Sequence, residues 1–208
     1  ALAVSMTGMV ACTMLFCLAA GDFDLSIGSV VACSGVLAAV VMNKTESITL
    51  GVLAGLASGA LVGVINGYVV AKLRINALIT TLATMQIVRG FGFIISDGKA
   101  VGIAQEDFFS LGNSVLLGIP TPVWITAICF AVFGFILNRT VFGRDTLAVG
   151  GNSEASHLAG IAVDRVKIAI FAAQGVMAAF AGIVLASRIT SGQPNTSQGF
   201  ELEVISAC

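Results

Sequence analysis

Long apolar runs separated by short polar stretches dominate the chain. Six of these runs predict membrane-spanning helices, at about residues 1–20, 26–42, 50–71, 76–95, 118–137 and 166–187. The start of another run follows Glu203. Most runs are near the roughly 20 residues that a helix needs to cross a bilayer. We therefore expect an all-α fold, a polytopic membrane helix bundle with about six complete spans plus the start of another, and we treat residues 1–208 as one transmembrane domain.

The composition excludes several classes of protein. Of the 208 residues, 57% are apolar and 10% are charged, whereas soluble domains carry about 25% charged residues. The chain lacks the polar surface of a water-soluble enzyme, and its apolar excess excludes an intrinsically disordered segment. Its net charge of −1 provides no basic field for phosphates, which excludes a nucleic-acid-binding protein.

No spacing in the sequence is typical of a metal or phosphate site. The five cysteines lie in apolar stretches without CxxC or Cys/His spacing, and buried cysteine mostly behaves as a small apolar residue. His157 is the only histidine. A GxxxxGK[ST] loop is also absent from the sequence. We therefore expect no metal, no cofactor and no ATP hydrolysis by this chain itself.

Lysine and arginine are distributed unevenly between the two sets of connections. Those on one side carry Lys72, Arg74, Arg139, Arg144, Arg165 and Lys167. Those on the other side carry Lys44, Lys99 and Arg188. Because cytoplasmic connections of membrane proteins are enriched in these residues, we expect the first set to face the cytoplasm. Residues 138–165 then form a long cytoplasmic loop, and residues 96–117 face outward.

The run at 50–71 has a glycine at every fourth position, namely Gly51, Gly55, Gly59, Gly63 and Gly67. Residues four apart share one face of a helix. A smooth face of this kind usually lets another helix approach closely. We therefore predict a helix-packing face, with a lining of the substrate path as the alternative.

Residues 21–29 place Asp22 and Asp24 between two apolar runs. Asp24 or Ser26 is suited to cap the helix that follows. If the segment lies at membrane depth, it marks a broken helix, and ionisable residues there are candidates for function. We therefore regard Asp22, Asp24 and Ser26 as candidates for the translocation path, a role that is compatible with capping.

A polar stripe in the run at 76–95 adds Asn76, Thr80 and Thr84, spaced by four on one helix face. Threonine hydroxyls in membrane helices more often bond the backbone or a neighbouring helix than a ligand. A stripe that lines the path is the alternative. Arg89 projects from another side, where we expect its long side chain to reach toward the membrane interface.

The loop at 138–165 contains a helix signature. Asn152 is a favourable N-cap, Glu154 suits the first turn and Gly160 suits the position after the last turn. These residues predict a helix of about two turns at 153–159. A helix this short needs tertiary support, so it either docks against a partner or rests on the bundle.

Several of these segments together resemble one family. They are residues 21–29 (GDFDLSIGS), 66–67 (NG), 76–90 (NALITTLATMQIVRG), 143–160 (GRDTLAVGGNSEASHLAG), 191–194 (SGQP) and 201–202 (EL). In order and spacing they resemble the permease subunits of bacterial ABC importers for pentoses and hexoses, which include ribose, xylose, galactose and arabinose permeases. Residues 95–101 and 190–194 are most similar to the arabinose branch.

The resemblance implies a multi-pass protein of the bacterial inner membrane that translocates a monosaccharide by alternating access. It implies a longer protein, with one more membrane helix before this chain and several after it. The implied partners are ATP-binding-cassette ATPase subunits on the cytoplasmic side, a periplasmic sugar-binding protein, a second permease copy and the surrounding lipid. The family's ATPase-coupling segment maps onto Gly143, Arg144, Gly150, Gly151, Asn152, Ala155 and Gly160.

Three alternatives stay open at this point. The first is a permease for another substrate, such as branched-chain amino acids. The second is a secondary transporter without an ATPase, which should carry intramembrane carboxylate or histidine relays; beyond Asp22 and Asp24 the sequence has none. The third is a structural or signalling membrane subunit. Because Trp124 and Tyr68 are the only residues of their types, we expect weak sugar contacts in the path.

Overall fold

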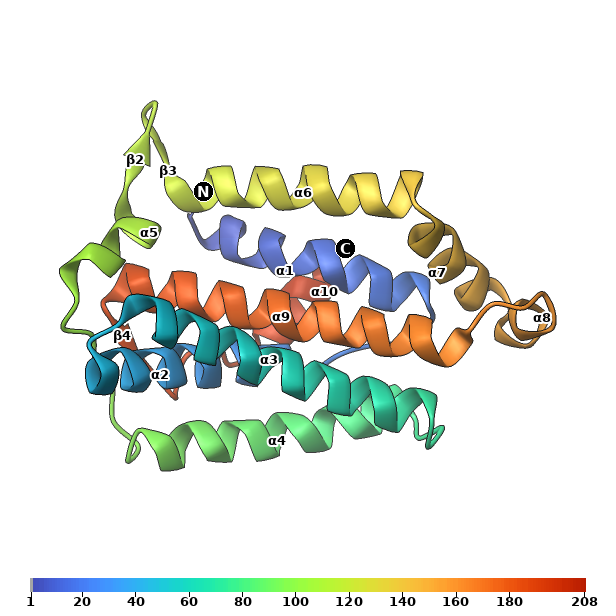
Figure 1. Ribbon diagram of the computed structural model, residues 1–208, viewed down its shortest axis with the longest axis horizontal. Helices are drawn as coiled ribbons and strands as arrows, with labels where there is room; N and C mark the ends of the chain where they lie inside the picture. Colours follow the sequence, from blue (N-terminus) through green and yellow to red (C-terminus); the bar gives the residue numbers. More distant parts are fainter. Residues whose placement is uncertain (1) are drawn as a thin grey trace.

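The computed structural model of the chain describes residues 2–208, with side chains from residue 4 onward. Residue 1, where the first predicted span begins, lies outside this part. Long helices lie side by side in a bundle (Figure 1), and they are α1 (Leu2–Ala19), α2 (Ile27–Thr45), α3 (Ile48–Ala71), α4 (Ala77–Ile95), α6 (Thr121–Arg139) and α9 (Val163–Ile189). α2, α3, α4, α6 and α9 are long and apolar enough to cross a membrane, while α1 is apolar but shorter. The predicted all-α membrane bundle is confirmed.

α2 and α9 form the centre of this bundle. Phe171, Ile183 and Val36 from these two helices are fully buried. In contrast, α3, α4 and α6 expose many large apolar side chains, including Leu61, Ile79 and Phe135. Exposed apolar surface on this scale marks an interaction with membrane or with other protein, as expected of helices at the rim of a membrane bundle.

The connection between α4 and α6 consists of short elements, namely β1 (Val101–Gly102), the 3₁₀ helix η1 (Glu106–Phe109), α5 (Ser110–Asn113), β2 (Val115–Leu116) and β3 (Ile119–Pro120). β2 pairs with β3, and β1 pairs antiparallel with β4 (Ser191–Gly192), with Val101 opposite Gly192. This pairing ties the connection to the segment that follows α9.

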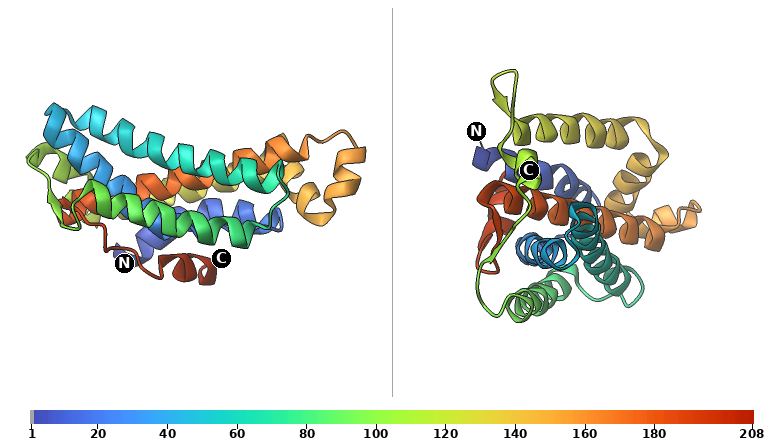
Figure 2. Two further views of the ribbon diagram at one scale, coloured as in Figure 1. Left: turned by 90° about the horizontal axis from the view of Figure 1, so that it is seen from below. Right: turned by 60° about the vertical axis from the view of Figure 1, so that its left-hand side comes forward.

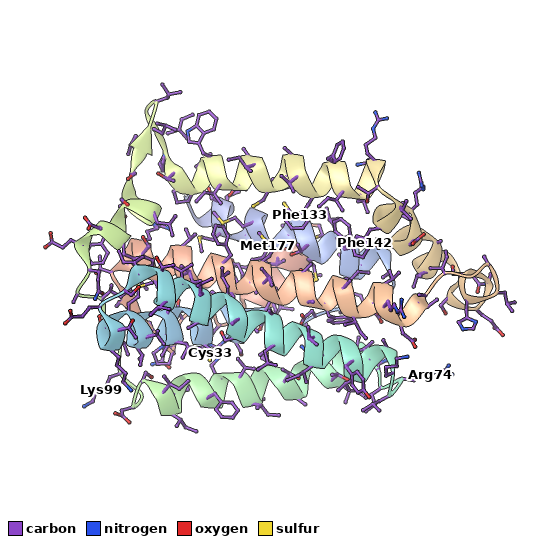
Figure 3. The ribbon with its side chains drawn as sticks, viewed as in Figure 1. Cys33, Arg74, Lys99, Phe133, Phe142 and Met177 are labelled. Carbon is purple, nitrogen blue, oxygen red and sulfur yellow. The ribbon has the colours of Figure 1, made fainter. Side chains whose placement is uncertain are left out.

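Each of the two predicted sets of connections lies at one end of the bundle. Lys72 Nζ lies 2.7 Å from Asp164 Oδ2, which joins the turn after α3 to the start of α9. At the opposite end, Asn43 Nδ2 donates a hydrogen bond of 2.7 Å to the Gly102 carbonyl. Figure 3 shows Arg74 and Lys99 at these opposite ends. The grouping of the connections is confirmed, while the end that faces the cytoplasm stays a prediction.

The prediction of a loop over residues 138–165 is wrong for the first half of that segment, which is helical. α7 (Val141–Gly151) follows α6 after a single residue, and α8 (Ser153–Leu158) and α10 (Phe200–Ser206) complete the helices that the structure describes. Thr140 caps α7 by accepting a hydrogen bond from the Gly143 N–H at 3.2 Å. Phe142 packs its ring on Phe16 of α1 at 5.9 Å between centroids. These contacts stabilise a segment whose glycines suggest a loop.

The glycine face of α3 lies against α2 and α9. A Cβ atom added at Gly59 would collide with the Gly175 carbonyl of α9, and one at Gly63 would collide with the Phe171 carbonyl. A Cβ atom added at the remaining glycines of this face would also contact α2 or α9: it would collide with α2 at Gly51, and the nearest atom of α9 would lie at 3.0 Å for Gly55 and 2.8 Å for Gly67. Helix backbones approach this closely only where no side chain separates them.

Candidate functional site

The candidate site begins at the break between α1 and α2. α1 ends at Ala19, residues 20–26 are not helical, and α2 begins at Ile27. α2 runs beside the second half of α9, because a Cβ atom added at Gly35 would lie 3.0 Å from the Gly182 carbonyl oxygen. That register places the start of α2 about 16 Å along α9 from its first residue. The break therefore lies within the depth of the bundle, where irregular backbone is tolerated only inside protein or beside a cavity.

Asp24 is buried in this break and stabilises the start of α2. Its Oδ1 accepts hydrogen bonds from the Ser26 backbone N–H at 2.9 Å and from Ser26 Oγ at 2.6 Å. The carboxylate also lies at the N-terminal end of α2, where the helix dipole favours a negative charge. The Ser26 side chain makes no cap hydrogen bond. Of the two predicted capping residues, Asp24 is therefore the one that satisfies a backbone donor.

Asn66 of α3 extends this pair into a network that joins three helices. Its Nδ2 donates to Ser26 Oγ at 3.0 Å, and its Oδ1 accepts from Thr84 Oγ1 of α4 at 2.7 Å. Asp24, Ser26 and Asn66 are all buried. Satisfied buried networks fix one arrangement of the elements that they join. We call Asp24, Ser26, Asn66 and Thr84 the polar network.

Three more buried polar side chains find no hydrogen-bond partner within residues 2–208. They are Ser29 near the start of α2, Thr80, which lies one turn before Thr84 on α4, and Gln174 of α9. Gln174 lies seven residues after Lys167 and therefore on the same helix face. Unpartnered buried polar groups are rare and often mark functional regions. The inner faces of α4 and α9 are thus more polar than packing requires.

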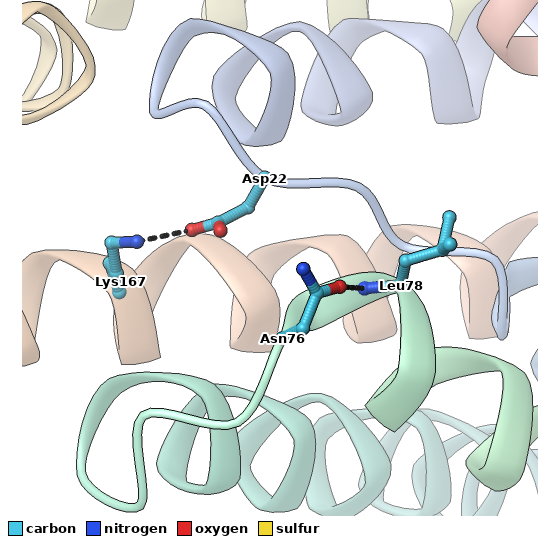
Figure 4. Close-up of polar contacts among 4 residues, drawn as sticks. All are labelled: Asp22, Asn76, Leu78 and Lys167. Atoms are coloured by element: carbon cyan, nitrogen blue, oxygen red, sulfur yellow. Dashed lines mark hydrogen bonds and ion pairs between the residues drawn. The ribbon is translucent and has the colours of Figure 1, made fainter.

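Asp22 and Asn76 lie apart from the polar network. Asp22 Oδ2 is 2.7 Å from Lys167 Nζ of α9, and these side chains are 12% and 20% exposed. Asn76 is exposed at the start of α4, where its Oδ1 accepts a hydrogen bond of 2.9 Å from the Leu78 N–H. Figure 4 shows both contacts. The predicted stripe of Asn76, Thr80 and Thr84 is therefore divided between the helix end and the bundle interior.

A cavity of about 750 Å³ separates these two residues from α8. Asp22, Asn76 and Lys167 line it from the bundle, and Glu154 and His157 line it from α8. The cavity thus places α8 beside the Asp22–Lys167 ion pair and the segment that leads to the polar network.

The predicted helix at 153–159 is confirmed as α8. Asn152 Oδ1 accepts a hydrogen bond of 2.9 Å from the Ala155 N–H, as expected of an N-cap. Gly160 has a φ of 88°, the left-handed conformation that suits glycine after a helix. α8 is largely exposed, and Leu158 is 84% exposed. An apolar side chain this exposed at the tip of the fold is suited to a protein contact.

The predicted coupling residues divide into two groups. Gly143 and Gly150 hold α7 against its neighbours, because a Cβ atom there would collide with the carbonyls of Leu137 and Ala19, respectively. The others are exposed, and they are Arg144, Gly151, Asn152, Ala155 and Gly160. Arg144 lies in the first half of α7, whereas Gly151, Asn152, Ala155 and Gly160 lie on α8 or next to its ends.

The expectation for Arg89 is wrong. Its guanidinium donates hydrogen bonds to the carbonyls of Pro194 at 3.1 Å and Thr196 at 2.7 Å, instead of reaching the membrane interface. The chain after α9 returns into the bundle and brings these carbonyls to α4. Asn66 was missed as a site residue, although an asparagine inside an apolar run is itself a signal of a buried polar contact.

Comparison with known proteins gives a consistent result. The L-arabinose transport system permease protein AraH of Escherichia coli strain K12 is 65% identical over 207 residues, which cover 100% of this chain and 63% of that protein. The L-arabinose ABC transporter permease protein AraH of Azospirillum brasilense is 52% identical, over 100% of this chain and 61% of that protein. The ribose import permease protein RbsC of Haemophilus influenzae is 39% identical, over 98% of this chain and 64% of that protein. No solved structure matches the chain.

The chain thus spans less than two thirds of the length of these curated relatives. A family model described as branched-chain amino acid transport system / permease component matches residues 1–208. Because that match covers the whole chain, the chain belongs to this family of transport-system permease components.

Proposed function

We propose that this chain is part of the membrane-spanning permease subunit of an ABC importer, and that the subunit translocates L-arabinose across the bacterial inner membrane. The observation that carries the proposal is the 65% identity to an L-arabinose permease along the whole chain. The five helices that are able to cross a membrane support a location in the bilayer.

The substrate follows from the relatives. The family description mentions branched-chain amino acids, and such a permease remains the second candidate. The relatives at 65% and 52% identity are both arabinose permeases, and ribose permeases are less similar at 39%. This order favours a pentose, and L-arabinose before ribose. A secondary transporter is less favoured, because Asp22 is held in an ion pair and Asp24 accepts two local hydrogen bonds.

We propose α8 as the docking element for an ATP-binding-cassette ATPase subunit. Its support is the exposed surface around Asn152, Ala155 and Leu158, next to the cavity that Asp22 and Lys167 also line. A docked ATPase supplies the tertiary support that so short a helix needs. A periplasmic sugar-binding protein and a second permease copy complete the proposed assembly, and lipid covers the exposed apolar faces of α3, α4 and α6.

We propose that the sugar crosses beside the polar network by alternating access. ATP binding changes the position of α8, and the movement reaches the bundle through α9 and the cavity. A ligand-driven change of this kind requires different affinities for the two conformations. The candidate path residues are Asp22, Asp24, Ser26, Thr80 and Thr84. We add Asn66, because it bonds Ser26 and Thr84, and we retain Asn76 as a residue of the cytoplasmic end.

The experiment is uptake of labelled L-arabinose by permease-deficient cells that express the full-length permease, with ribose and galactose as competitors. Uptake that is lost with a hydrolysis-deficient ATPase partner supports the proposal. Uptake that does not depend on that ATPase indicates a secondary transporter. Uptake of branched-chain amino acids without uptake of sugar assigns the second candidate substrate.

A further inference from the structure

A second segment enters the bundle from the end opposite to residues 20–26. After α9 ends at Ile189, residues 190–199 return along the bundle to α10 (Figure 2). α10 lies beside the middle of α1, because Cys208 Sγ is 3.6 Å from the Ala11 carbonyl oxygen. We call residues 20–26 the inner segment and residues 190–199 the outer segment. Each leads from one end of the bundle to a helix that begins within its depth.

The residues where the two segments become helical share a sequence pattern. Residues 23–29 read FDLSIGS and residues 200–206 read FELEVIS, which gives the common pattern F-[DE]-L-x-[IV]-x-S. The apolar residue at the fifth position, Ile27 in one copy and Val204 in the other, is fully buried in both. Paired broken helices that enter from opposite sides are typical of transporters that expose a central site alternately.

The two segments meet at Gly28. A Cβ atom at this position would lie 2.6 Å from the Ser197 carbonyl oxygen and 2.6 Å from Glu201 Oε2. The start of α2 therefore packs directly against the end of the outer segment and the first turn of α10. Only glycine permits this contact without displacing one of them. In this arrangement the outer segment covers the start of α2, two residues beyond Ser26 of the polar network.

Each segment is also held by one cation from a neighbouring helix. The inner segment is held by the ion pair between Asp22 and Lys167 of α9, at 2.7 Å. The outer segment is held by Arg89 of α4, which donates to two of its carbonyls, those of Pro194 and Thr196. Charge-assisted hydrogen bonds of this kind are stronger than neutral ones, and each ties an otherwise irregular segment to a long helix.

We propose that the inner and outer segments are the two gates of the translocation path, and that Lys167 and Arg89 are the positioning residues that hold them closed. In this structure both cations hold their segments, which under the proposal is the closed state of each gate. Transport then requires that the two cations release their segments alternately. The inference rests on the proposed function, because it assumes a permease that opens to one side at a time.

The test measures from which side a reporter thiol becomes accessible. Ser29 follows Gly28, is fully buried, and its hydroxyl has no partner in the described part of the chain. Ser29→Cys therefore changes little, and it is placed in the full-length permease with the native cysteines replaced, assembled with its ATPase in membrane vesicles. A membrane-impermeant maleimide is added to right-side-out or inside-out vesicles, without sugar, and the rate of labelling is measured.

Arg89→Gln is expected to increase labelling from outside by about tenfold and leave labelling from inside unchanged. Asp22→Asn is expected to do the reverse. Arg89→Lys, which keeps the charge, should restore part of the protection, and the exchange Asp22→Lys with Lys167→Asp should restore the inner gate. Lys99→Gln, at an exposed cation of the outer end, is the matched control and should change neither rate.

The proposal is overturned if Arg89→Gln and Asp22→Asn open the same side, or if neither changes a labelling rate. If Arg89→Gln does not assemble, Gly28→Ala tests the outer gate independently, because the added methyl group must displace the outer segment. Since labelling needs no substrate, a permease that transports another solute would still show these rates. Failure of the gates is therefore distinguishable from failure of the arabinose assignment.

Discussion

Asn66 Nδ2 donates a hydrogen bond of 3.0 Å to Ser26 Oγ, and this bond fixes the start of α2 against α3. The same amide accepts a hydrogen bond from Thr84 of α4 through its oxygen, at 2.7 Å. One side chain thus relates three helices at the point where the chain between α1 and α2 is not helical. Its donor and acceptor are both used, so no isosteric apolar residue can replace it.

Asn66→Leu is therefore expected to reduce uptake strongly and to lower the stability of the purified permease. It leaves the hydroxyls of Ser26 and Thr84 with one partner fewer each, and a lost buried hydrogen bond costs about 1–3 kcal/mol. Thermal unfolding in detergent and uptake measure the two effects. Asn138→Leu is the matched control, because Asn138 is exposed and donates to the Gly134 carbonyl of its own helix. Equal behaviour of the two variants would show that the polar network is dispensable.

The glycine face gives a second prediction. Gly59→Leu is expected to destabilise the bundle by about 1–3 kcal/mol through overpacking, because a Cβ atom at Gly59 would collide with the Gly175 carbonyl. The control is Gly90→Leu on α4, where no atom lies within 4 Å of an added Cβ. Unfolding temperatures in detergent compare the two. A Gly59→Leu protein as stable as Gly90→Leu would mean that α3 and α9 do not pack as described.

The spans were predictable because each apolar run is long and is interrupted by charges. α8 was predictable because Asn152 and Gly160 encode its two ends locally. α7 was not, because its glycines are poor helix formers and its stability comes from contacts with Ala19 and Phe16, which are distant in sequence. Tertiary packing overrides local propensity in such cases.

The candidate site was predictable only where its contacts join residues that are close in sequence. The bonds between Asp24 and Ser26 are local, and the sequence segment alone indicated them. The partner of Ser26 depends on how far α3 is shifted along α2, a register that no single segment encodes. Arg89 depends in the same way on the return of residues 190–199 into the bundle.

The exposed apolar tip of α8 gives a prediction for the ATPase contact. Leu158→Glu is expected to reduce recovery of the ATPase with the full-length permease. Leu158 is exposed in the free chain but would be buried in the complex, and burying a charge in its place is unfavourable. Leu117→Glu is a close control, since Leu117 is 85% exposed and Leu158 is 84% exposed, but Leu117 lies at the opposite end of the bundle. Pull-down of the ATPase measures the difference.

Bulky replacements of Asn152 or Ala155 should act like Leu158→Glu, with membrane insertion unchanged. Normal recovery with all three would contradict docking at α8.

The two ion pairs at the start of α9 differ in exposure, and this difference gives the last prediction. The pair between Lys72 and Asp164 is 51% and 42% exposed, so Asp164→Ala should change stability by about 1 kcal/mol or less. The pair between Lys167 and Asp22 is 20% and 12% exposed, and Asp22→Ala leaves the lysine without its partner in a poorly hydrated position. We expect a loss of about 2–4 kcal/mol, somewhat below that of a fully buried pair.

Thermal unfolding of the two alanine variants in the same detergent measures this difference, and added salt sharpens the comparison. Salt screens exposed pairs more than buried ones, so the small effect of Asp164→Ala should vanish at high ionic strength while that of Asp22→Ala persists. The variant Asp22→Ala with Lys167→Ala should regain part of the stability, because it removes the unpaired charge. Equal losses for both single variants would mean that Asp22 is hydrated, and that residues 20–26 do not lie within the bundle.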